Sequence, residues 1–507
     1  MIARFFQEKI PKIILFIEHL RPEKWWVWIT IAILIRLPIW VERLKVHGYW
    51  AGDTASYLDP VENFLSYGKW EPDYRYPGYG LLYLLFRAWM SKVYAEYALV
   101  GLQALLAAIA AYLMALTVYK ITHKKYAYII TYLLYVPNHH VSYWDTILLT
   151  DSITASTLTY SLFLLISSLH GNKKYIFWSG FFLFYSYLLR PASLICVPFY
   201  VFFLILWNDS FRYKLRNIFF YFLPGIILIL LFIGFFYNRQ KHNLFSFLFR
   251  TRFYSYIEKT HEKLLIYFDG LACYPCQPYA ILNDFTKWDP TWSPYATSGV
   301  IIKDNFTSAP PKEIDISLRM KYFRKCHHTS QYNEDSLYHY LYVCRDSIRK
   351  SDRVTANVLD SIIKIRLEKY ILSIRKEYPI YYYVTSRLIA TLYMITLGRR
   401  VNSGVSYLRL IFGLSSFIIF HLLPVILYFA FLLLYAFWII RDRNIIQARY
   451  LVLSLTGFMI AFAYAGIIRW PEPRYLLSAY PFIFLGAMLL INDLISWSKL
   501  TRTYNLK

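Results

Sequence analysis

Long apolar stretches constrain the fold of this chain more than any other feature of its sequence. Ten stretches of roughly 20 residues carry few or no charges, which is the length that an α-helix needs to cross a hydrocarbon core of about 30 Å. They lie at 25–41, 96–119, 126–143, 151–169, 175–190, 191–207, 218–237, 414–440, 449–468 and 475–496. The sequence therefore predicts an all-α polytopic membrane protein with about ten transmembrane helices.

The composition agrees with a membrane protein and argues against a nucleic-acid-binding one. Of the 507 residues, 57% are hydrophobic and 20% aromatic, more than the mixed surface of a soluble protein allows. The net charge of +24 would suggest nucleic acid in a soluble protein. In a membrane protein, Lys and Arg hold loops in the cytoplasm and bind anionic lipid headgroups. We expect membrane lipids as partners and no nucleic acid, because no nucleic-acid-binding motif occurs.

The basic loops predict the topology. With ten spans, the basic segments fall on one side, which the positive-inside rule makes the cytoplasm. They are the segment before the first span, 120–125, 170–174, 212–216, 441–449 and the C-terminal tail. Both termini are then cytoplasmic, and the first span stays as an anchor because no signal-peptide cleavage pattern precedes it. We expect a multi-pass protein of the plasma membrane, with the bacterial inner membrane favoured and the active site facing the periplasm or exterior.

Two regions then lie outside the cytoplasm. Residues 42–95 carry many Trp and Tyr side chains, which favour short interfacial helices. Residues 238–400 are charged and proline-containing, and we expect a small external α or α+β domain there that ends in an amphipathic segment near 380–398. The chain thus divides into an N-terminal transmembrane catalytic module (1–237), this external domain (238–400) and C-terminal transmembrane helices (401–507).

Four of the five cysteines lie in the external domain, and Cys196 lies in a span. The four are Cys273, Cys276, Cys326 and Cys344. An even number in an oxidising compartment favours structural disulfides, with at most one external thiol left free. The Cys-Tyr-Pro-Cys spacing also leaves a metal site or redox chemistry open.

Three aspartates stand at the outer ends of spans, where a charge near hydrocarbon costs a few kcal/mol and so calls for a partner or a function. Asp53 follows the first span, Asp151 begins the fourth, and Asp145 lies six residues earlier. Six residues turn a helix by about 600°, so Asp145 and Asp151 would not share a face of one helix. The alternatives are a helix N-cap for Asp151 and an exposed loop carboxylate for Asp53.

Four arginines oppose the positive-inside rule at the same side. Arg75 lies in the first external loop and Arg190 ends the fifth span. Arg469 and Arg474 flank a short external turn. A guanidinium group is a natural bidentate partner for phosphate oxygens. Snorkelling to headgroups or pairing with Glu472 is the alternative for any one of them. His421, within the eighth span, is expected to bond to a neighbouring helix, with a functional role as the alternative.

The order of these motifs resembles that of the C-type glycosyltransferases (GT-C fold), in the protein-mannosyltransferase-like and aminoarabinose-transferase-like group. The matching motifs are Asp53, Arg75-Tyr76-Pro77-Gly78-Tyr79, Thr150-Asp151, Leu189-Arg190-Pro191 and Arg474-Tyr475. The resemblance covers residues 45–205 well and the C-terminal spans loosely. It does not extend to residues 238–400.

The resemblance implies a cell-envelope hexosyl- or pentosyltransferase that moves a sugar from a polyprenyl phosphate to a lipid, glycan or protein acceptor, with inversion. It implies Asp53 as the general base, Asp151 as a second essential carboxylate and Arg75 at the phosphate. The further substrate-binding candidates are Tyr76, Tyr79, Asp145, Arg190, Arg469, Arg474 and Tyr475. The family often has a carboxylate before the basic residue, where this chain has Tyr74. No cofactor is therefore assigned beyond a divalent metal cation as an option.

Two other function classes fit a chain of this composition. A transporter or flippase of lipid-linked sugars would place ionisable groups near the bilayer midplane, often in broken helices. A structural subunit would use its external domain to bind a partner. The charges here gather at the outer ends of mostly uninterrupted spans, which favours the enzyme.

Overall fold

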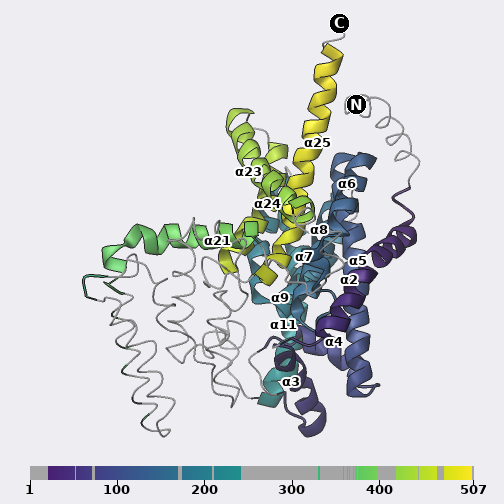
Figure 1. Ribbon diagram of the computed structural model, residues 1–507, viewed down its shortest axis with the longest axis vertical. Helices are drawn as coiled ribbons and strands as arrows, with labels where there is room; N and C mark the ends of the chain where they lie inside the picture. The colour runs from purple at the N-terminus through teal and green to yellow at the C-terminus, as the bar shows by residue number, and fades with distance from the viewer. Residues whose placement is uncertain are drawn as a thin grey trace. The chain divides into compact units, whose positions relative to one another are not determined.

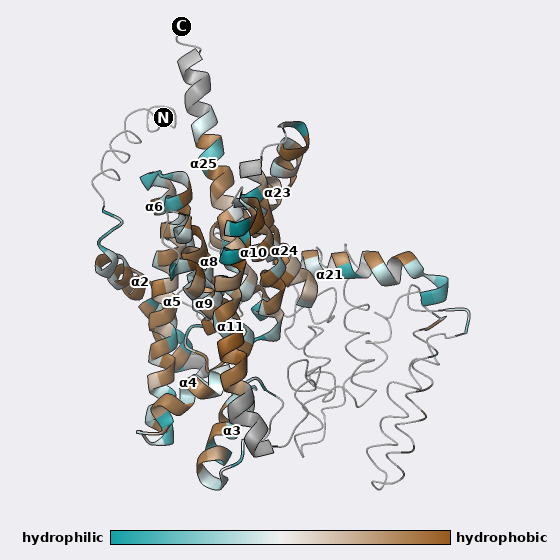
Figure 2. Ribbon diagram, turned by 180° about the vertical axis from the view of Figure 1, so that it is seen from behind, coloured by the Kyte–Doolittle hydropathy of each residue, from teal (hydrophilic) through white to brown (hydrophobic). Residues whose placement is uncertain are grey.

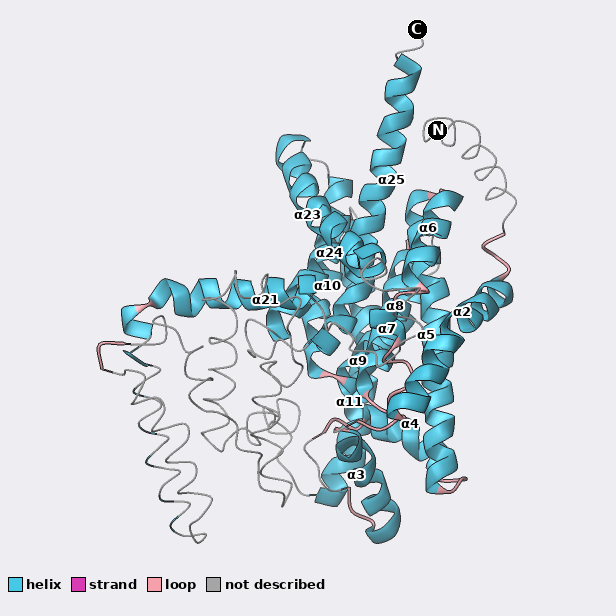
Figure 3. Ribbon diagram, viewed as in Figure 1, coloured by secondary structure: helices cyan, strands magenta, loops and turns pink. Residues whose placement is uncertain are grey.

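The computed structural model describes helices joined by loops, with no strand in the described residues (Figure 3). These residues are 21–51, 53–70, 75–169, 174–207, 210–240, 329–331, 375–397, 418–442, 445–464 and 473–504, with separate positions between 355 and 373. The chain splits into two units. The first comprises Met1–His242, Thr396–Ala461 and Pro473–Lys507, and the second comprises Asn243–Ile395 and Phe462–Glu472.

Four helices of the described part are long and apolar enough to cross a membrane, as expected of a membrane protein. They are Lys92–Thr122, Phe211–Phe232, Ile419–Arg441 and Arg474–Trp497, and each coincides with a predicted span. In the labels of Figure 1 they belong to α5 (Lys92–Thr122), α11 (Phe211–Gln240), α23 (Leu423–Asp442) and α25 (Tyr480–Tyr504). Figure 2 shows the apolar character of α5 and α11 along much of their length.

The other predicted spans form helices that are shorter or more polar. These are α2 (Trp25–His47), α6 (Lys125–Tyr135), α8 (Thr150–Ser168), α9 (Lys174–Leu189), α10 (Cys196–Trp207) and α24 (Ile445–Phe462). Pro191–Trp207 and Ala448–Phe462 are apolar but have fewer than 18 residues. The count of ten spans therefore stays a prediction.

A continuous helix over 126–143 was the wrong expectation. Helix α6 ends at Tyr135, and the four-residue helix α7 (His139–Ser142) follows after a turn. Pro137 accounts for the break, because proline has no N–H to donate to the carbonyl four residues earlier and its ring clashes with that carbonyl. Arg36 of α2 donates hydrogen bonds to the carbonyls of Val136 and Tyr135 at 2.9 and 3.4 Å. A cation thus caps the broken helix end, where the backbone dipole favours positive charge.

Helix α8 is central to the first unit and packs against α5, α9 and the 3₁₀ helix η8 (Pro473–Ala479). Most of its side chains are buried although many carry hydroxyl groups. Thr154, Thr157 and Thr159 donate to carbonyls four residues earlier, at 2.7, 2.9 and 2.8 Å. These intrahelical bonds let a helix rich in threonine be buried.

The predicted first external loop, 42–95, contains two helices, α3 (Thr54–Tyr67) and α4 (Gly78–Arg87). Glu62 joins them by accepting hydrogen bonds from Tyr83 at 2.6 Å and Arg87 at 2.9 Å. The side chains of Tyr67 and Trp89 are 78% and 88% exposed, which suits helices at a membrane interface. The helices are as predicted, and their interfacial position stays a prediction.

The start of α4 lies against the end of α9 because residue 78 has no side chain. A Cβ atom there would stand 2.7 Å from the carbonyl oxygen of Leu188, closer than atoms in contact can be. The Tyr185 hydroxyl donates to the Gly78 carbonyl at 2.9 Å and closes the same contact. This approach brings the segment before α4 next to the segment after α9.

In the second unit, the described residues are few. They include the π-helix η5 (Tyr381–Thr385) and helix α21 (Ser386–Leu397), which falls in the predicted amphipathic segment near 380–398. Leu388 and Leu392 of α21 are 40% and 43% exposed. Most of the predicted external domain lies outside the described residues, including its four cysteines and the disulfides predicted for them. Cys196 of α10 is a buried free thiol.

Candidate active site

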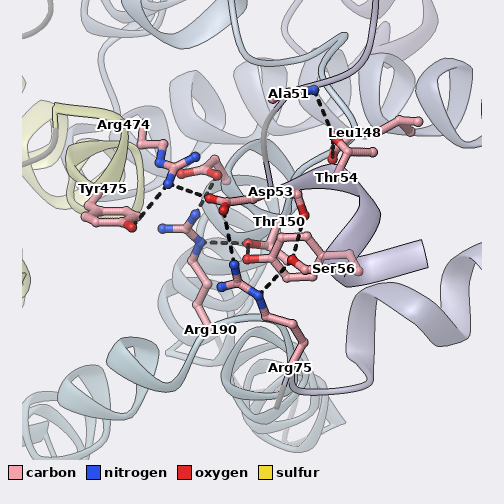
Figure 4. Close-up of polar contacts among 12 residues, drawn as sticks. Ala51, Asp53, Thr54, Ser56, Arg75, Leu148, Thr150, Arg190, Arg474 and Tyr475 are labelled. Atoms are coloured by element: carbon pink, nitrogen blue, oxygen red, sulfur yellow. Dashed lines mark hydrogen bonds and ion pairs between the residues drawn. The ribbon is translucent and has the colours of Figure 1, made fainter. Parts of the chain in front are cut away.

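The candidate active site lies in the first unit, where the ends of several helices meet (Figure 4). Its members are Asp53 at the N-cap of α3, Arg75 before α4, Thr150 and Asp151 in the first turn of α8, Arg190 between α9 and the 3₁₀ helix η1 (Pro191–Ile195), and Arg474 and Tyr475 in η8. We call this set the arginine cluster. Residues 421 positions apart in the chain touch within it.

Asp53 stands between two arginines. Its Oδ1 lies 3.3 Å from Nη2 of Arg75, and its Oδ2 accepts a hydrogen bond from Nη2 of Arg474 at 2.7 Å. Asp53 occupies an N-cap position, yet its carboxylate makes no capping bond. Its backbone carbonyl instead accepts from the amide and hydroxyl of Ser56, at 3.1 and 2.6 Å. The carboxylate is therefore left to face the arginines, and its side chain is 36% exposed.

The arginines keep Asp53 ionised. Burial raises the pKa of the Asp53 carboxyl group, but the positive charges of Arg474 and Arg75 outweigh burial. The pKa consequently lies below its ordinary value. Nearby cations favour the charged form of an acid, so Asp53 is a carboxylate at neutral pH.

Arg75 is held by the first turn of α3. Its Nε donates to the Ser56 hydroxyl at 3.0 Å, and its guanidinium lies 4.6 Å above the ring of Tyr57. Ser56 and Tyr57 are three and four residues after Asp53, which places all three side chains on neighbouring positions of one helical turn. Ser56 and Tyr57 were not among the predicted site residues. The helical spacing from Asp53 was the signal that could have found them.

Arg190 is held by the first turn of α8. Its Nε donates to the Thr150 hydroxyl at 2.8 Å and its Nη2 to Asp151 at 2.5 Å. Arg190 has extended backbone, as expected before Pro191, and this turns its side chain out of the line of α9. Asp151 is not the N-cap, which is Leu149, and its side chain is only 1% exposed. Its role in the structure is to pair with Arg190.

The ring of Tyr475 contacts two arginines. The guanidinium groups of Arg190 and Arg474 lie 4.7 and 5.1 Å from its centroid, within the range of cation–π attraction. Arg474 also donates to the Tyr475 hydroxyl at 3.3 Å. Tyr475 is buried, and it contacts both the arginine that pairs with Asp151 and one of the two that pair with Asp53.

A short tether fixes Asp53 to the start of α8. The Thr54 hydroxyl accepts from the amide of Ala51 at 2.9 Å and donates to the carbonyl of Leu148 at 3.0 Å. The amide of Leu148 in turn donates to the carbonyl of Tyr49 at 2.9 Å. These bonds connect the first external loop to the loop before Thr150, so Asp53 and Asp151 are placed by the same contacts.

Three predicted site residues lie outside the arginine cluster. Tyr79 is fully buried behind it, with its ring 5.6 Å from that of Tyr57 and its hydroxyl bonded to Gln103. Tyr76 packs its ring against Tyr187 at 5.4 Å. Asp145 is the third, and Arg469 is not among the described residues.

Asp145, predicted from the sequence as a substrate-binding residue, lies outside the arginine cluster in a different, fully buried group. Its Oδ2 accepts from Arg36 at 2.8 Å and from Trp40 at 3.2 Å, and its Oδ1 accepts from Ser152 at 2.7 Å. Both Asp145 and Arg36 are 0% exposed. Both carboxylate oxygens are engaged and closed to solvent, so this ion pair is structural.

His421 bonds to neighbouring segments, as expected. Its Nδ1 is hydrogen-bonded to the Tyr480 hydroxyl, and its Nε2 lies 3.3 Å from the carbonyl oxygen of Thr396. Its ring is buried and lies 5.3 Å from that of His140.

The carboxylates of the arginine cluster are paired with cationic side chains. Within the described ranges, no three His, Cys, Asp or Glu side chains are placed to hold a metal ion. Both carboxylates of the cluster face guanidinium groups instead. Three arginines against two aspartates leave one surplus positive charge, which suits a monoanionic group better than a metal.

Comparison of the chain with known protein families, with characterised proteins and with solved structures finds no match. The resemblance to the C-type glycosyltransferases therefore rests on the motifs alone.

Proposed function

We propose that this chain is an integral membrane glycosyltransferase, which moves a sugar from a polyprenyl phosphate to an acceptor hydroxyl with inversion. The arginine cluster carries this proposal. It combines a set of guanidinium groups suited to an anion with a partly exposed carboxylate, in a unit that has helices long and apolar enough to cross a membrane. Arg75, Arg190 and Arg474 bind the donor phosphate in this scheme.

The reaction needs one proton acceptor. The acceptor oxygen attacks the anomeric carbon of the sugar, and the bond from that carbon to the phosphate oxygen breaks. The electron pair of that bond leaves with the polyprenyl phosphate, whose negative charge the arginines stabilise. The proton of the acceptor hydroxyl goes to Asp53. Attack from the face opposite the phosphate inverts the anomeric centre.

Exposure supports Asp53 over Asp151 as the base. An acceptor hydroxyl must come within hydrogen-bond reach of the group that takes its proton. The Asp53 side chain is 36% exposed, whereas that of Asp151 is 1% exposed and is bonded to Arg190. Asp151 acts in this scheme by holding Arg190.

We place the arginine cluster at the external surface of the membrane. The loop charges that make 1–24 and the C-terminal tail cytoplasmic support this side, together with the location of the cluster at helix ends. Ten spans and an external domain at 238–400 belong to the same proposal. A flippase of lipid-linked sugars would share the phosphate site but would not need a proton acceptor.

The first test is transfer by an Asp53→Asn variant. Mass spectrometry of lipid bound to the purified protein identifies the donor, which is then supplied in a transfer assay. General-base catalysis contributes about 10²–10⁴-fold, so Asp53→Asn should lower the transfer rate by at least about 100-fold. Asp59→Asn, which removes a carboxylate from the same helix outside the arginine cluster, is the matched control. Near-normal transfer by Asp53→Asn would show that the base lies elsewhere.

A further inference from the structure

Asp53 makes the contacts that a phosphate would make in the arginine cluster. Two oxygens of one anionic group meet two guanidinium groups, at 3.3 Å from Arg75 and 2.7 Å from Arg474. A phosphodiester also offers two anionic oxygens, and arginine binds carboxylate and phosphate with the same geometry. The carboxylate and a ligand phosphate therefore compete for the same donors.

The two arginines are positioned by groups other than Asp53. Arg75 rests on Tyr57 and bonds to Ser56, while Arg474 rests on Tyr475 and bonds to its hydroxyl. Removing the carboxylate leaves these supports in place. An anion that replaces Asp53 would thus meet guanidinium groups already oriented, which lowers the entropic cost of its binding.

The ion pairs of Asp53 are also the ones in the arginine cluster that can open. Its side chain is 36% exposed, and partly exposed ion pairs are weak. The pair between Arg190 and Asp151 is enclosed, with side chains 8% and 1% exposed, and breaking it would leave a buried charge without its partner. Exchange with a ligand is therefore favoured at Asp53 and disfavoured at Asp151.

We propose that Asp53 occupies the position between Arg75 and Arg474 that a ligand anion would take, and that the donor phosphate displaces it from both arginines. The role of the displaced residue rests on the function proposed above. A carboxylate held by two cations is a weak base, and one released from them regains its ordinary basicity. Donor binding would then switch Asp53 from an ion-pair partner to the base, so that the acceptor is activated only when a donor is present.

The test is binding of farnesyl phosphate, a short isoprenyl monophosphate without a sugar, to the purified full-length protein in detergent. Asp53→Asn should bind it about tenfold more tightly than wild type, because two weak ion pairs and a like charge no longer oppose the phosphate. Asp59→Asn should bind as wild type does. Arg474→Gln should bind more weakly, and farnesol, which lacks the phosphate, should not distinguish the variants.

Unchanged or weaker binding of farnesyl phosphate by a folded Asp53→Asn variant would overturn the proposal. Thermal unfolding establishes whether the variant is folded, and Asp53→Ser replaces it in the same assay if it is not. If Asp53→Asn binds farnesyl phosphate more tightly but the wild type transfers no sugar, the exchange of anions is supported and the glycosyltransferase is refuted. If Asp53→Asn loses transfer but does not bind farnesyl phosphate more tightly, the glycosyltransferase is supported and the exchange is refuted.

Discussion

The two aspartates of the arginine cluster show how surroundings separate residues of one type. Both face arginine, but Asp151 is enclosed beside Arg190 while Asp53 reaches solvent between Arg75 and Arg474. The enclosed pair holds a neighbour in place, and the accessible one can meet a substrate. Sequence position alone does not distinguish them, because each stands at the start of a helix.

The charge of Asp53 should make its contribution to stability depend on pH in the acid range only. Burial raises the pKa of Asp53, but Arg474, Arg75 and Arg190 together outweigh burial and hold the pKa below the ordinary value of 3.8. The ion pairs then stabilise the fold fully above that ordinary value, and the stabilisation is lost as the pH falls through the lower folded-state pKa. The difference in unfolding temperature between wild type and Asp53→Asn should be constant from about pH 5 to 7 and shrink below 3.8. A difference that titrates between pH 5 and 7 would contradict this assignment.

The buried pair of Arg36 and Asp145 predicts a large effect on stability. Asp145→Ala leaves the guanidinium of Arg36 enclosed without its carboxylate, which costs about 3–5 kcal/mol of unfolding free energy. Denaturant or thermal unfolding in detergent measures the loss. The double variant Arg36→Met with Asp145→Leu should recover much of it, since an apolar pair of similar size needs no desolvated charge. An Asp145→Ala variant as stable as wild type would refute the structural role.

At the scale of single residues, the sequence was most informative where a charged residue lies at the outer end of an apolar span. Asp53, Arg75, Asp151, Arg190 and Arg474 were all predicted as site residues in that way, and the structure brings them together. Asp145 was assigned to the site by the same reasoning, but it lies outside the arginine cluster and pairs with Arg36. Its partner Arg36 lies 109 positions away inside an apolar stretch, and no local pattern reveals that pairing.

At the scale of elements, the contact between α4 and α9 depends on Gly78. Gly78→Ala would place a Cβ atom 2.7 Å from the Leu188 carbonyl oxygen and push the two helix ends apart. Overpacking of this kind costs about 1–3 kcal/mol, and it would move Arg75 relative to Arg190. We expect lower unfolding temperature together with weaker binding of farnesyl phosphate.

Gly101→Ala in α5 is the matched control. A Cβ atom at residue 101 would meet nothing within 4 Å, and alanine is the better helix former. This variant should be as stable as wild type or slightly more so, with unchanged binding. Equal effects of the two substitutions would show that the close approach at Gly78 does not matter.

Hydropathy predicted the positions of helices better than their ends. The helices α5, α11, α23 and α25 fall on predicted spans, because a long apolar run can be recognised without knowing which helices pack beside it. Helix α8 lies where expected. It is buried among other helices although its sequence is rich in threonine, and hydropathy alone does not predict that burial. The break after α6 follows from Pro137. This residue lies inside the apolar stretch 126–143, so hydropathy predicted one continuous span there.

At the scale of the whole molecule, the loop charges predict a single topology. Both termini should be cytoplasmic and residue 300 external. A cysteine placed at residue 300 in a variant without its native cysteines should react with an impermeant maleimide on intact cells. A cysteine at residue 505 should react only after the membrane is permeabilised. Labelling of residue 300 only from the cytoplasmic side would overturn the proposed side of the arginine cluster.

The distance in sequence between Asp53 and Arg474 has a consequence for biosynthesis. A ribosome completes and inserts the segments bearing Asp53, Arg75, Asp151 and Arg190 long before it reaches Arg474. Until then, two arginines face two aspartates, and the nascent site has no surplus charge. A chain that stops short of residue 474 therefore lacks the surplus positive charge that would attract a phosphate group.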